Sequence, residues 1–376
     1  ISVLVYMVMI TPIELLINMI KIYSPSNKED NIRIYINKLL SEEFKADKIY
    51  IDKAGNIIGI YNGTEPTILL SSHMDTVPGE IAVRIDEEKI YGRGASDAKG
   101  PLATFLYSSY LLKRVENYPL KIMVVGTVDE EGGSKGIKEL PNTLQKLNVK
   151  PSYAIFGEPG GANVITIGYR GRIQLRIKLF AESYHASLPN IPNAIEDMAI
   201  VLSALKNYER KFKTFSNFTS ITITPTIITG GHAINVTPRE CEVILDIRVP
   251  PTRSTNEFLS DIINIVKSTT NLKNECIVED FTEPYELNIS TPLIAAFREA
   301  ILQIANANAK LIRKSGTGEM NIFAQKCNIP IITYGPGDPK ISHTDNEYIL
   351  LHDYELAIRI VKQALWVINS YVSKLR

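Results

Sequence analysis

The stretch KIMVVGTVDEEGG, residues 121–133, begins as a continuous apolar run and ends in three acids and two glycines. Continuous apolar runs of this length are typical of strands that are buried on both faces of a sheet. Three adjacent acids, Asp129, Glu130 and Glu131, would repel one another at the end of such a strand. A cation would offset that repulsion, so the stretch predicts a charged site at the end of a buried strand.

Three other apolar runs also end in polar residues, namely TILLSSHMDT (67–76), YAIFGEP (153–159) and IPIITYGPGD (329–338). Helical patterns separate the runs, at about 99–115, 134–145, 292–305 and 347–373. An alternation of strands and helices predicts an α/β fold with a mostly parallel sheet. Ligands of such sheets bind at the carboxyl ends of the strands, which is where the polar residues stand.

The middle of the chain has a different pattern. RIQLRIKLFA (172–181) alternates with period two, and two further strands, SITITPTIIT (220–229) and CEVILDIRV (241–249), follow a helix at about 192–211. A second helix at about 254–269 and a strand at about 275–281 complete the order β-α-β-β-α-β. This order predicts a ferredoxin-like domain over 169–284, inserted into a larger domain formed by 1–168 and 285–376.

Composition limits the classes of partner. The chain of 376 residues carries 41 Lys and Arg against 41 Asp and Glu, so no overall charge favours nucleic acid or an anionic membrane. Three scattered cysteines favour a reducing cytoplasm over a disulfide framework. Pro12 and Glu14 interrupt the apolar N-terminal segment, so we expect neither a membrane span nor a cleaved signal there, and we expect Met7 or Met9 to be the true start.

Histidine is rare, with five in the chain, and two of these residues follow buried strands: His73 in SSHMD and His343 in ISHTDNE. Several carboxylates stand between them, at Asp97, Glu130, Glu131 and Glu158. Imidazole and carboxylate ligands suit Zn²⁺, Co²⁺ or Mn²⁺. Asp75 stands two residues after His73, so on a strand it would face the same way, and we expect its carboxylate to accept the second ring N–H of His73.

Each signal has an ordinary structural explanation when it is taken alone. A His after a strand is often a hydrogen-bonded structural residue. An acid pair before Gly-Gly is often a solvated turn, and Ser134 could cap the helix that follows. GRGASDAKG (92–100) could be a phosphate-binding turn, although it lacks the spacing of a Walker motif. The occurrence of all these motifs at strand ends favours a metal site.

The chain closely resembles the M20 family of dinuclear metallo-aminoacylases and carboxypeptidases over nearly its whole length. The resemblance is carried by SSHMDTVP, GRGASDAKG, VDEEGG, GEP, GGHAINVTP, DIRVPP, SGTGEMN and SHTDNE. It implies a metallopeptidase-like catalytic domain, a lid and dimerisation domain, and two divalent metal ions, Zn²⁺ or Co²⁺. The ligands it implies are His73 and Glu158 for one ion, Glu131 and His343 for the other, and Asp97 as a bridge between the two. It also implies that the peptide bond from Asp97 to Ala98 is cis.

The resemblance also implies roles for residues that are not ligands. Glu130 would be the general base, with Asp75 supporting the catalytic site. We expect Glu130 and Glu131 to point to opposite sides, because adjacent residues at a strand end do so, and Asp129 to be a bystander on the outer turn. Together these residues would hydrolyse an amide without a covalent intermediate.

Further candidates come from the inserted domain and the segment that follows it. SYHASLPN matches the lid motif of the family, which implies that His185 acts on the site of a partner subunit in a homodimer. Asn235 and Arg248 match positions that hold the substrate carboxylate, and Gly316 in SGTGEMN is a further substrate-binding candidate. The alternatives are a capping role for His185 and a surface ion pair for Arg248.

Within the family, GRGASDAKGPLATF and the YGPGD and SHTDNE motifs are similar to those of archaeal hydrolases that free lysine or ornithine from an acidic amino-group carrier protein. The alternatives are a deacylase of N-acetylornithine or N-succinyl-diaminopimelate, a carboxypeptidase or aminopeptidase, and a metal-free binding module. The strand YRGRIQLRIK would place Arg170, Arg172, Gln174, Arg176 and Lys178 on one face. This basic stripe could steer an acidic protein, or it could be an ordinary solvated face.

Overall fold

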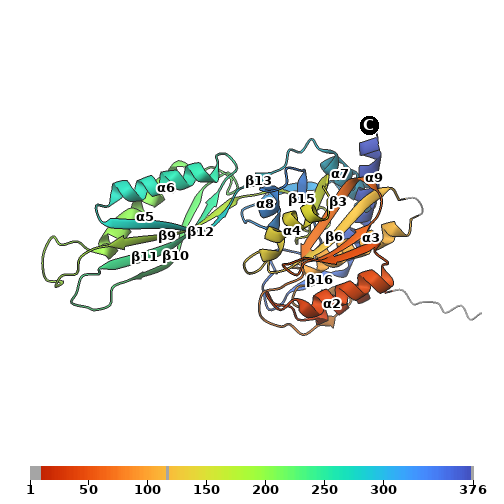
Figure 1. The fold of residues 1–376 in the computed structure, drawn as a ribbon, viewed down its shortest axis with the longest axis horizontal. Coiled ribbons are helices and arrows are strands. Elements are labelled where there is room, and N and C mark those ends of the chain that lie inside the picture. The colour runs from red at the N-terminus through yellow and green to blue at the C-terminus, as the bar shows by residue number, and fades with distance from the viewer. Residues whose placement is uncertain (1–9, 116–117, 374–376) are drawn as a thin grey trace, which may run out of the picture. The chain divides into compact units, whose positions relative to one another are not determined.

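The computed structural model describes residues 10–115 and 118–373 (Figure 1), so Met7 and Met9 lie outside the described residues. The chain divides into two compact units. The first comprises the described residues up to Ile167, with Leu287–Ile312 and the chain from Ile322 onward; the second comprises Gly168–Glu286 and Arg313–Asn321. The main boundaries lie within two residues of those expected.

The short segment Arg313–Asn321 belongs to the second unit, which the sequence did not indicate. Hydrogen bonds to the backbone explain the difference. Thr317 Oγ1 donates to the carbonyl oxygen of Arg170 at 2.8 Å, and Asn321 Nδ2 donates to that of Glu283 at 2.9 Å. These bonds tie the SGTGEMN motif to the two ends of the inserted segment.

The first unit is built on a mixed sheet whose strands run in the order β1-β2-β6-β3-β7-β15-β8. The strands are β1 (Lys48–Ile51), β2 (Ile57–Tyr61), β3 (Thr64–His73), β6 (Leu120–Thr127), β7 (Tyr153–Phe156), β8 (Val164–Tyr169) and β15 (Ile331–Thr333), and β14 (Lys310–Lys314) pairs with β8. The four central strands β6, β3, β7 and β15 are parallel, whereas β1, β2 and β8 are antiparallel to their neighbours. The predicted parallel sheet is therefore confirmed for the strands that carry the motifs.

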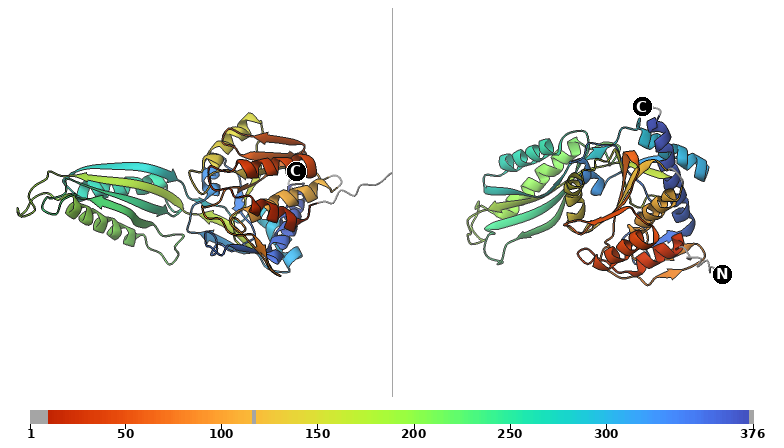
Figure 2. Two further views of the ribbon diagram at one scale, coloured as in Figure 1. Left: turned by 90° about the horizontal axis from the view of Figure 1, so that it is seen from below. Right: turned by 45° about the vertical axis from the view of Figure 1, so that its right-hand side comes forward.

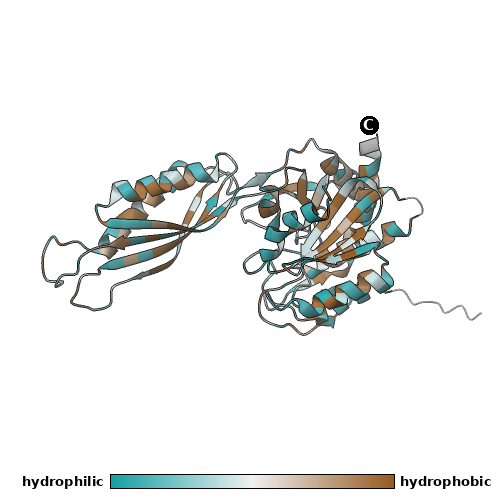
Figure 3. Cartoon of the chain, in the orientation of Figure 1, coloured by the Kyte–Doolittle hydropathy of each residue, from teal (hydrophilic) through white to brown (hydrophobic). Residues whose placement is uncertain are grey.

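The central strands are buried because their residues are apolar on both faces. The last eight residues of β3 are all buried, and the same strands are coloured as hydrophobic in Figure 3. The helices of this unit are α1 (Pro12–Lys21), α2 (Asp30–Lys38), the π-helical turn Leu39–Glu43, α3 (Lys99–Lys113), α4 (Lys135–Lys146), α7 (Pro292–Ala305) and α9 (Leu351–Ser373), and the short helix α8 (Glu319–Ala324) begins in the last residues of the segment Arg313–Asn321. The packing of α3 and α7 against α9 helps to enclose this core.

The last helix begins later than predicted. Residues Tyr348–Leu350 form a short strand, β16, which pairs with β5 (Lys89–Tyr91), and β5 pairs in turn with β4 (Arg84–Ile85). The expectation of a helix from residue 347 is therefore wrong by four residues. The reason is a pairing with a segment more than 250 residues away, which local periodicity cannot show.

The second unit has the element order β-α-β-β-α-β. Its elements are β9 (Gly171–Phe180), α5 (Ala194–Lys211), β10 (Thr222–Gly230), β11 (Glu240–Val249), α6 (Thr255–Thr269) and β12 (Lys273–Thr282), with the two-residue strand β13 (Tyr285–Glu286) after them. The sheet order is β10-β11-β9-β12, and all neighbours are antiparallel. Burial alternates along β9, and both helices cover the face that carries Ile173, Leu175 and Ile177, as the right-hand view of Figure 2 shows.

Two further properties bear on function. In the described ranges, no helix is both long and apolar enough to cross a membrane. All three cysteines, Cys241, Cys276 and Cys327, are free thiols.

Candidate metal centre

The predicted metal ligands of the first unit come together at one edge of its sheet. His73 is the last residue of β3, Glu130 and Glu131 follow β6, and Glu158 follows β7. His343 lies in the loop after β15. Because these four strands are parallel, their carboxyl ends meet at the same edge, and polar residues after them become neighbours.

Nitrogen and carboxylate oxygen atoms form three close groups in this region, and within each group they lie within 4.8 Å of one another. The groups are His73, Asp97 and Glu158; Asp97, Glu131 and His343; and His73, Glu130 and Glu131. The first two groups share Asp97, whose Oδ1 lies 3.2 Å from Nε2 of His73 and whose Oδ2 lies 3.4 Å from Nε2 of His343. Each carboxylate oxygen of Asp97 thus faces a different imidazole, as a bridging ligand requires.

The buried ring of His73 is held in one orientation. Its Nδ1 lies 2.9 Å from the backbone carbonyl oxygen of Asp75, which can only accept, so Nδ1 carries the proton. Nε2 faces Oδ1 of Asp97 at 3.2 Å, and it is the ring nitrogen that would bind a metal ion in the group of His73, Asp97 and Glu158. The expectation that the carboxylate of Asp75 accepts this proton is wrong: its Oδ1 is 3.6 Å away, because β3 ends at His73 and the alternation of a strand does not continue to Asp75.

The carboxylate of Asp75 instead holds the turn that carries the acid pair. Oδ1 accepts the backbone N–H of Glu130 at 3.0 Å, and Oδ2 accepts that of Glu131 at 3.1 Å. Ser26 Oγ also donates to Oδ2, at 2.6 Å. Burial would raise the pKa of Asp75, but the neighbouring His73 imidazole, with Ser26 and the Glu130 N–H, lowers it to about 2. Asp75 is therefore an ionised group that holds the backbone of Glu130 and Glu131.

Replacing Asp75 with Asn is expected to lower kcat by about 10- to 100-fold, because the amide offers one acceptor oxygen where two backbone donors need one each. Kinetics on metal-loaded protein would measure the loss. Ser26→Ala removes one donor to the same carboxylate and should lower kcat by less. A wild-type kcat in Asp75→Asn would contradict the positioning role.

The turn after β6 corrects two expectations. Asp129 is buried, adopts φ +63°, accepts from Asn27 Nδ2 at 3.2 Å and donates its N–H to Glu29 at 3.0 Å, so it is not a bystander on an outer turn. Glu130 and Glu131 do not point to opposite sides, because both reach His73 from a turn rather than from a strand. A Cβ on Gly132 would collide with the Asp129 carboxylate, which explains that glycine.

A buried carboxylate that sequence reasoning missed holds the loop of Asp97. Glu347 Oε1 accepts the backbone N–H groups of Ser96 and Asp97, both at 3.0 Å, and its Oε2 lies 3.0 Å from Nη1 of Arg93. Glu347 is the last residue of the SHTDNE motif, but no local pattern shows that it turns inward. The peptide bond between Asp97 and Ala98 is cis, which confirms that expectation.

The donor set fits divalent metal ions. Two imidazoles and four carboxylates converge in one place, and they are the nitrogen and oxygen ligands that Zn²⁺ and Co²⁺ accept. Hydrogen bonding to Asp97 and the charge of Glu131 raise the pKa of His343 to about 9, while burial raises the pKa of Glu131. These pKa shifts are expected in a pocket where several carboxylates lie close together, and such a pocket attracts cations.

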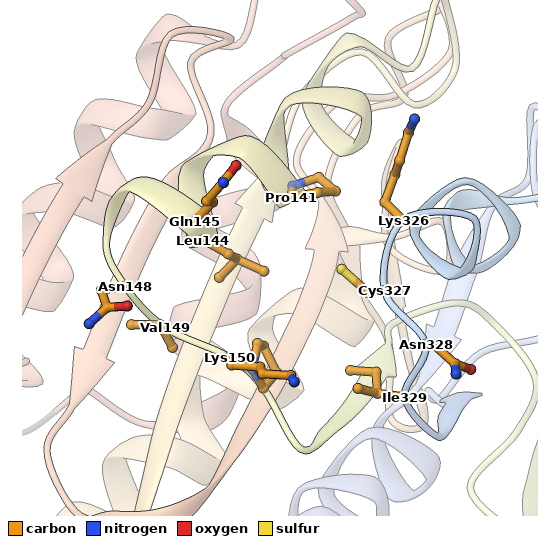
Figure 4. A pocket seen from close by; sticks show the side chains of 11 residues that line it. Pro141, Leu144, Gln145, Asn148, Val149, Lys150, Lys326, Cys327, Asn328 and Ile329 are labelled. Atoms are coloured by element: carbon orange, nitrogen blue, oxygen red, sulfur yellow. The ribbon is translucent and has the colours of Figure 1, made fainter.

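A cavity of about 580 Å³ in the first unit lies outside this cluster (Figure 4). It is lined by Pro141, Leu144, Gln145, Asn148, Val149, Lys150, Pro151, Lys326, Cys327, Asn328 and Ile329. The lining has neither a His nor a carboxylate, and burial raises the pKa of Cys327. The cavity is therefore not a second hydrolytic site.

The other candidates lie in the second unit, in two places. His185 is exposed, and its Nδ1 accepts the backbone N–H of Ser187 at 3.3 Å and lies 2.7 Å from Ser187 Oγ. The next residue, Ala186, donates its N–H to the carbonyl oxygen of Asn235 at 3.0 Å. Arg248 lies elsewhere: Nε and Nη2 donate to the two oxygens of Asp246 at 2.6 and 3.1 Å, and Nη1 donates to Thr317, beside the exposed Gly316.

The two places are at opposite ends of the second sheet. His185 and Asn235 lie beyond the ends where Phe180 pairs with Glu240, whereas Arg248 pairs with Arg172 at the other end. The strand from Glu240 to Arg248 alone spans about 27 Å. Asn235 and Arg248 of one chain therefore cannot hold the same carboxylate.

The basic stripe on β9 is neutralised, so it is not the free positive surface that its sequence suggested. Arg170 is buried and donates to the carbonyl oxygens of Ser315 and Ser220. The other cations pair with acids of the neighbouring strands: Arg172 with Asp246 and Asp280, Arg176 with Glu242 and Glu279, and Lys178 with Glu240 and Glu242. This face is an ion-pair network rather than a docking stripe.

Comparisons with known proteins agree with the geometry. Residues 69–366 match the model of peptidase family M20/M25/M40. The chain is 36% identical to a LysW-lysine/LysW-ornithine hydrolase of Saccharolobus islandicus, over 94% of each chain. Its fold is similar to that of the M20 family metallo-carboxypeptidase Sso-CP2 of Sulfolobus solfataricus, with a TM-score of 0.79 at 18% identity over 96% of this chain and 99% of that one.

A further solved structure is similar in fold, that of the YXEP protein of Bacillus subtilis, described as a dinuclear metal-binding peptidase of the M20 family. The TM-score is 0.73 at 13% identity, over 95% of this chain and 98% of that one. Family membership rests on the model match and on the identity to the curated relative. The chain belongs to peptidase family M20/M25/M40 and is a hydrolase.

Proposed function

We propose that this hydrolase uses two divalent metal ions, Zn²⁺ or Co²⁺, to release lysine or ornithine from an acidic amino-group carrier protein. The bond cleaved would join the α-amine of the amino acid to the side-chain carboxyl of the C-terminal Glu of the carrier. The observation that carries the proposal is the pair of ligand groups that share Asp97. The name of the Saccharolobus islandicus relative supports the choice of substrate, which would place the reaction in lysine or arginine biosynthesis in the cytoplasm.

Different residues of the chain would have different roles in amide hydrolysis. When bound, the two ions would lower the pKa of a water molecule and polarise the amide carbonyl. Glu130 lies in the third group, with His73 and Glu131, beside the two groups that share Asp97, and there its carboxylate would accept the proton of the water and pass it to the leaving amine. Asp75 holds the backbone of Glu130 in place for this transfer.

We assign the second unit the role of a lid and dimerisation domain. Its edge strand β10 is exposed along nearly its whole length, and Ile227 and Ile228 are both more than half exposed. An exposed apolar edge of this kind favours pairing with a second copy. A homodimer would let His185 and Asn235 of one subunit serve the site of the other.

Mixing two inactive variants would test the shared site. His185→Ala and Glu130→Ala should each be inactive alone. After subunit exchange, about half of the dimers are mixed and each has one intact site, so about a quarter of wild-type activity is expected. Each variant put through the same exchange by itself is the control. A mixture that stays as inactive as its components would exclude action across the dimer.

One assay separates the proposed substrate from its alternatives. Metal-loaded protein would be incubated with carrier-linked lysine, carrier-linked ornithine, N-acetylornithine and N-succinyl-diaminopimelate, and the free amino acid would be measured. We expect release from the carrier. Cleavage of an acylated amino acid alone would show a small-molecule deacylase. Purified protein that binds well under one metal ion per chain would instead indicate a metal-free binding module.

A further inference from the structure

Three lysines border the turn that carries Glu130 and Glu131. Lys28 follows Asn27 in the loop before α2, and Lys135 and Lys138 lie in the first turn of α4. All three are exposed. Lys135 Nζ donates to Asn27 Oδ1 at 2.5 Å, so the two segments are joined directly, and Lys138 Nζ donates to the carbonyl oxygen of Gly133 at 2.9 Å. We call these three lysines, which lie on the two segments beside this turn, the lysine rim.

The lysine rim forms no direct ion pair with the described acids. In the described part of the chain, no carboxylate lies within 4 Å of any of its three ammonium groups, and the first turn of α4 has no acid. Two acids nearby in sequence are already paired, the exposed Asp30 with Arg33 and the partly buried Glu139 with Lys146. This contrasts with the cations of β9, each of which has an acidic partner.

The lysine rim is coupled to the catalytic turn by short links. Asn27, which Lys135 contacts, donates to the carboxylate of Asp129, and Ser26 donates to that of Asp75. Asp75 in turn holds the backbone of Glu130 and Glu131. A partner that binds the lysine rim would thus lie beside the general base.

We propose that the lysine rim is a docking surface for an acidic protein segment, and that it receives the acidic face of the carrier protein; this inference rests on the proposed function. Single exposed ion pairs contribute little free energy. Three cations that form no direct ion pair with the described acids act together by attracting an acidic partner at a distance, which raises the rate of association and makes it sensitive to salt.

The test reverses the three charges in one variant, Lys28→Glu, Lys135→Glu and Lys138→Glu. Two substrates are compared: the lysine-loaded carrier protein, and a γ-glutamyl-lysine dipeptide that contains the same amide bond. Cleavage of the dipeptide reports any disturbance of the turn itself. Such a disturbance could arise because Lys138 Nζ contacts Gly133 of the turn and Lys135 Nζ contacts Asn27, which donates to Asp129. We expect kcat/KM for the carrier to fall at least about tenfold more than kcat/KM for the dipeptide, and the salt dependence seen with the carrier to weaken.

A matched control reverses Lys45, Lys48 and Lys310, which are also exposed in the first unit; no acid of the described chain lies within 4 Å of their ammonium groups. This variant should keep wild-type kinetics on both substrates. Equal losses on carrier and dipeptide, or an equal loss on the carrier in the control variant, would overturn the docking role. Wild-type protein that cleaves the dipeptide but never the carrier would reject the proposed function, and the docking role with it.

Discussion

Replacing Glu130 with Gln is expected to lower kcat by a factor of about 10² to 10⁴ and to leave the metal content of the protein unchanged. The amide has the size of the carboxylate, so the turn held by Asp75 keeps its shape. The amide cannot accept a proton from water, and the step that Glu130 performs is lost. Stopped assays on metal-loaded protein would give kcat, and elemental analysis would give the metal content.

Glu131→Gln is the matched control, because it makes the same change one residue further along. It should lose metal, since Glu131 Oε1 lies 2.7 Å from His343 Nε2 within the second ligand group. Glu130 also lies in a possible ligand group with His73 and Glu131. If Glu130→Gln loses metal and Glu131→Gln keeps it, the roles of the two residues are reversed.

The cluster of candidate ligands could be predicted from the sequence because most of its members stand at a fixed place in a local pattern. His73 and the Glu130–Glu131 pair follow apolar runs, and parallel strands bring such run ends together. Three of the four helices predicted for the catalytic domain, α3, α4 and α7, also lie within two residues of their observed bounds. The resemblance to a family then predicted which residues bind which metal ion, and the spacing of the residues alone does not determine this.

The residues that hold the ligands could not be predicted in the same way. The Asp75 carboxylate binds backbone N–H groups 55 and 56 residues away, and Glu347 binds the N–H of Asp97 from 250 residues away. Backbone donors have no signature in the sequence, so nothing marks a carboxylate as their partner. Asp129 was misjudged for the same reason, because its partners Asn27 and Glu29 lie in the loop before α2.

Charge patterns show a related limit. Alternation correctly placed Arg172, Arg176 and Lys178 on one face of β9, but strand register decides what lies opposite them. Register places Asp246 and Glu242 of β11 on that face, and these acids neutralise it. The lysines of the rim follow no periodic pattern in the sequence, yet in the described part of the folded chain none of them forms an ion pair with an acid. A basic surface is therefore defined by the pairing of its charges and not by their spacing along one strand.

Replacing Asp97 with Ala is expected to remove both metal ions and to lower kcat/KM on the order of a thousandfold or more, since the ions supply several kcal/mol of transition-state stabilisation. Its two oxygens face different imidazoles, so one substitution takes a ligand from each ion. By contrast, His343→Ala removes a ligand from one ligand group only and should leave one ion bound. Elemental analysis after dialysis would count the ions in each variant.

Asp345→Ala provides a control for the loss of an acid near the site. Asp345 is fully exposed and lies 4.0 Å from Arg93, so its removal should change neither metal content nor kcat/KM. The comparison between Asp97 and His343 carries the argument for a shared ligand. If Asp97→Ala retains one ion while His343→Ala loses both, then His343 is the residue on which both ions depend, and the bridging role of Asp97 is wrong.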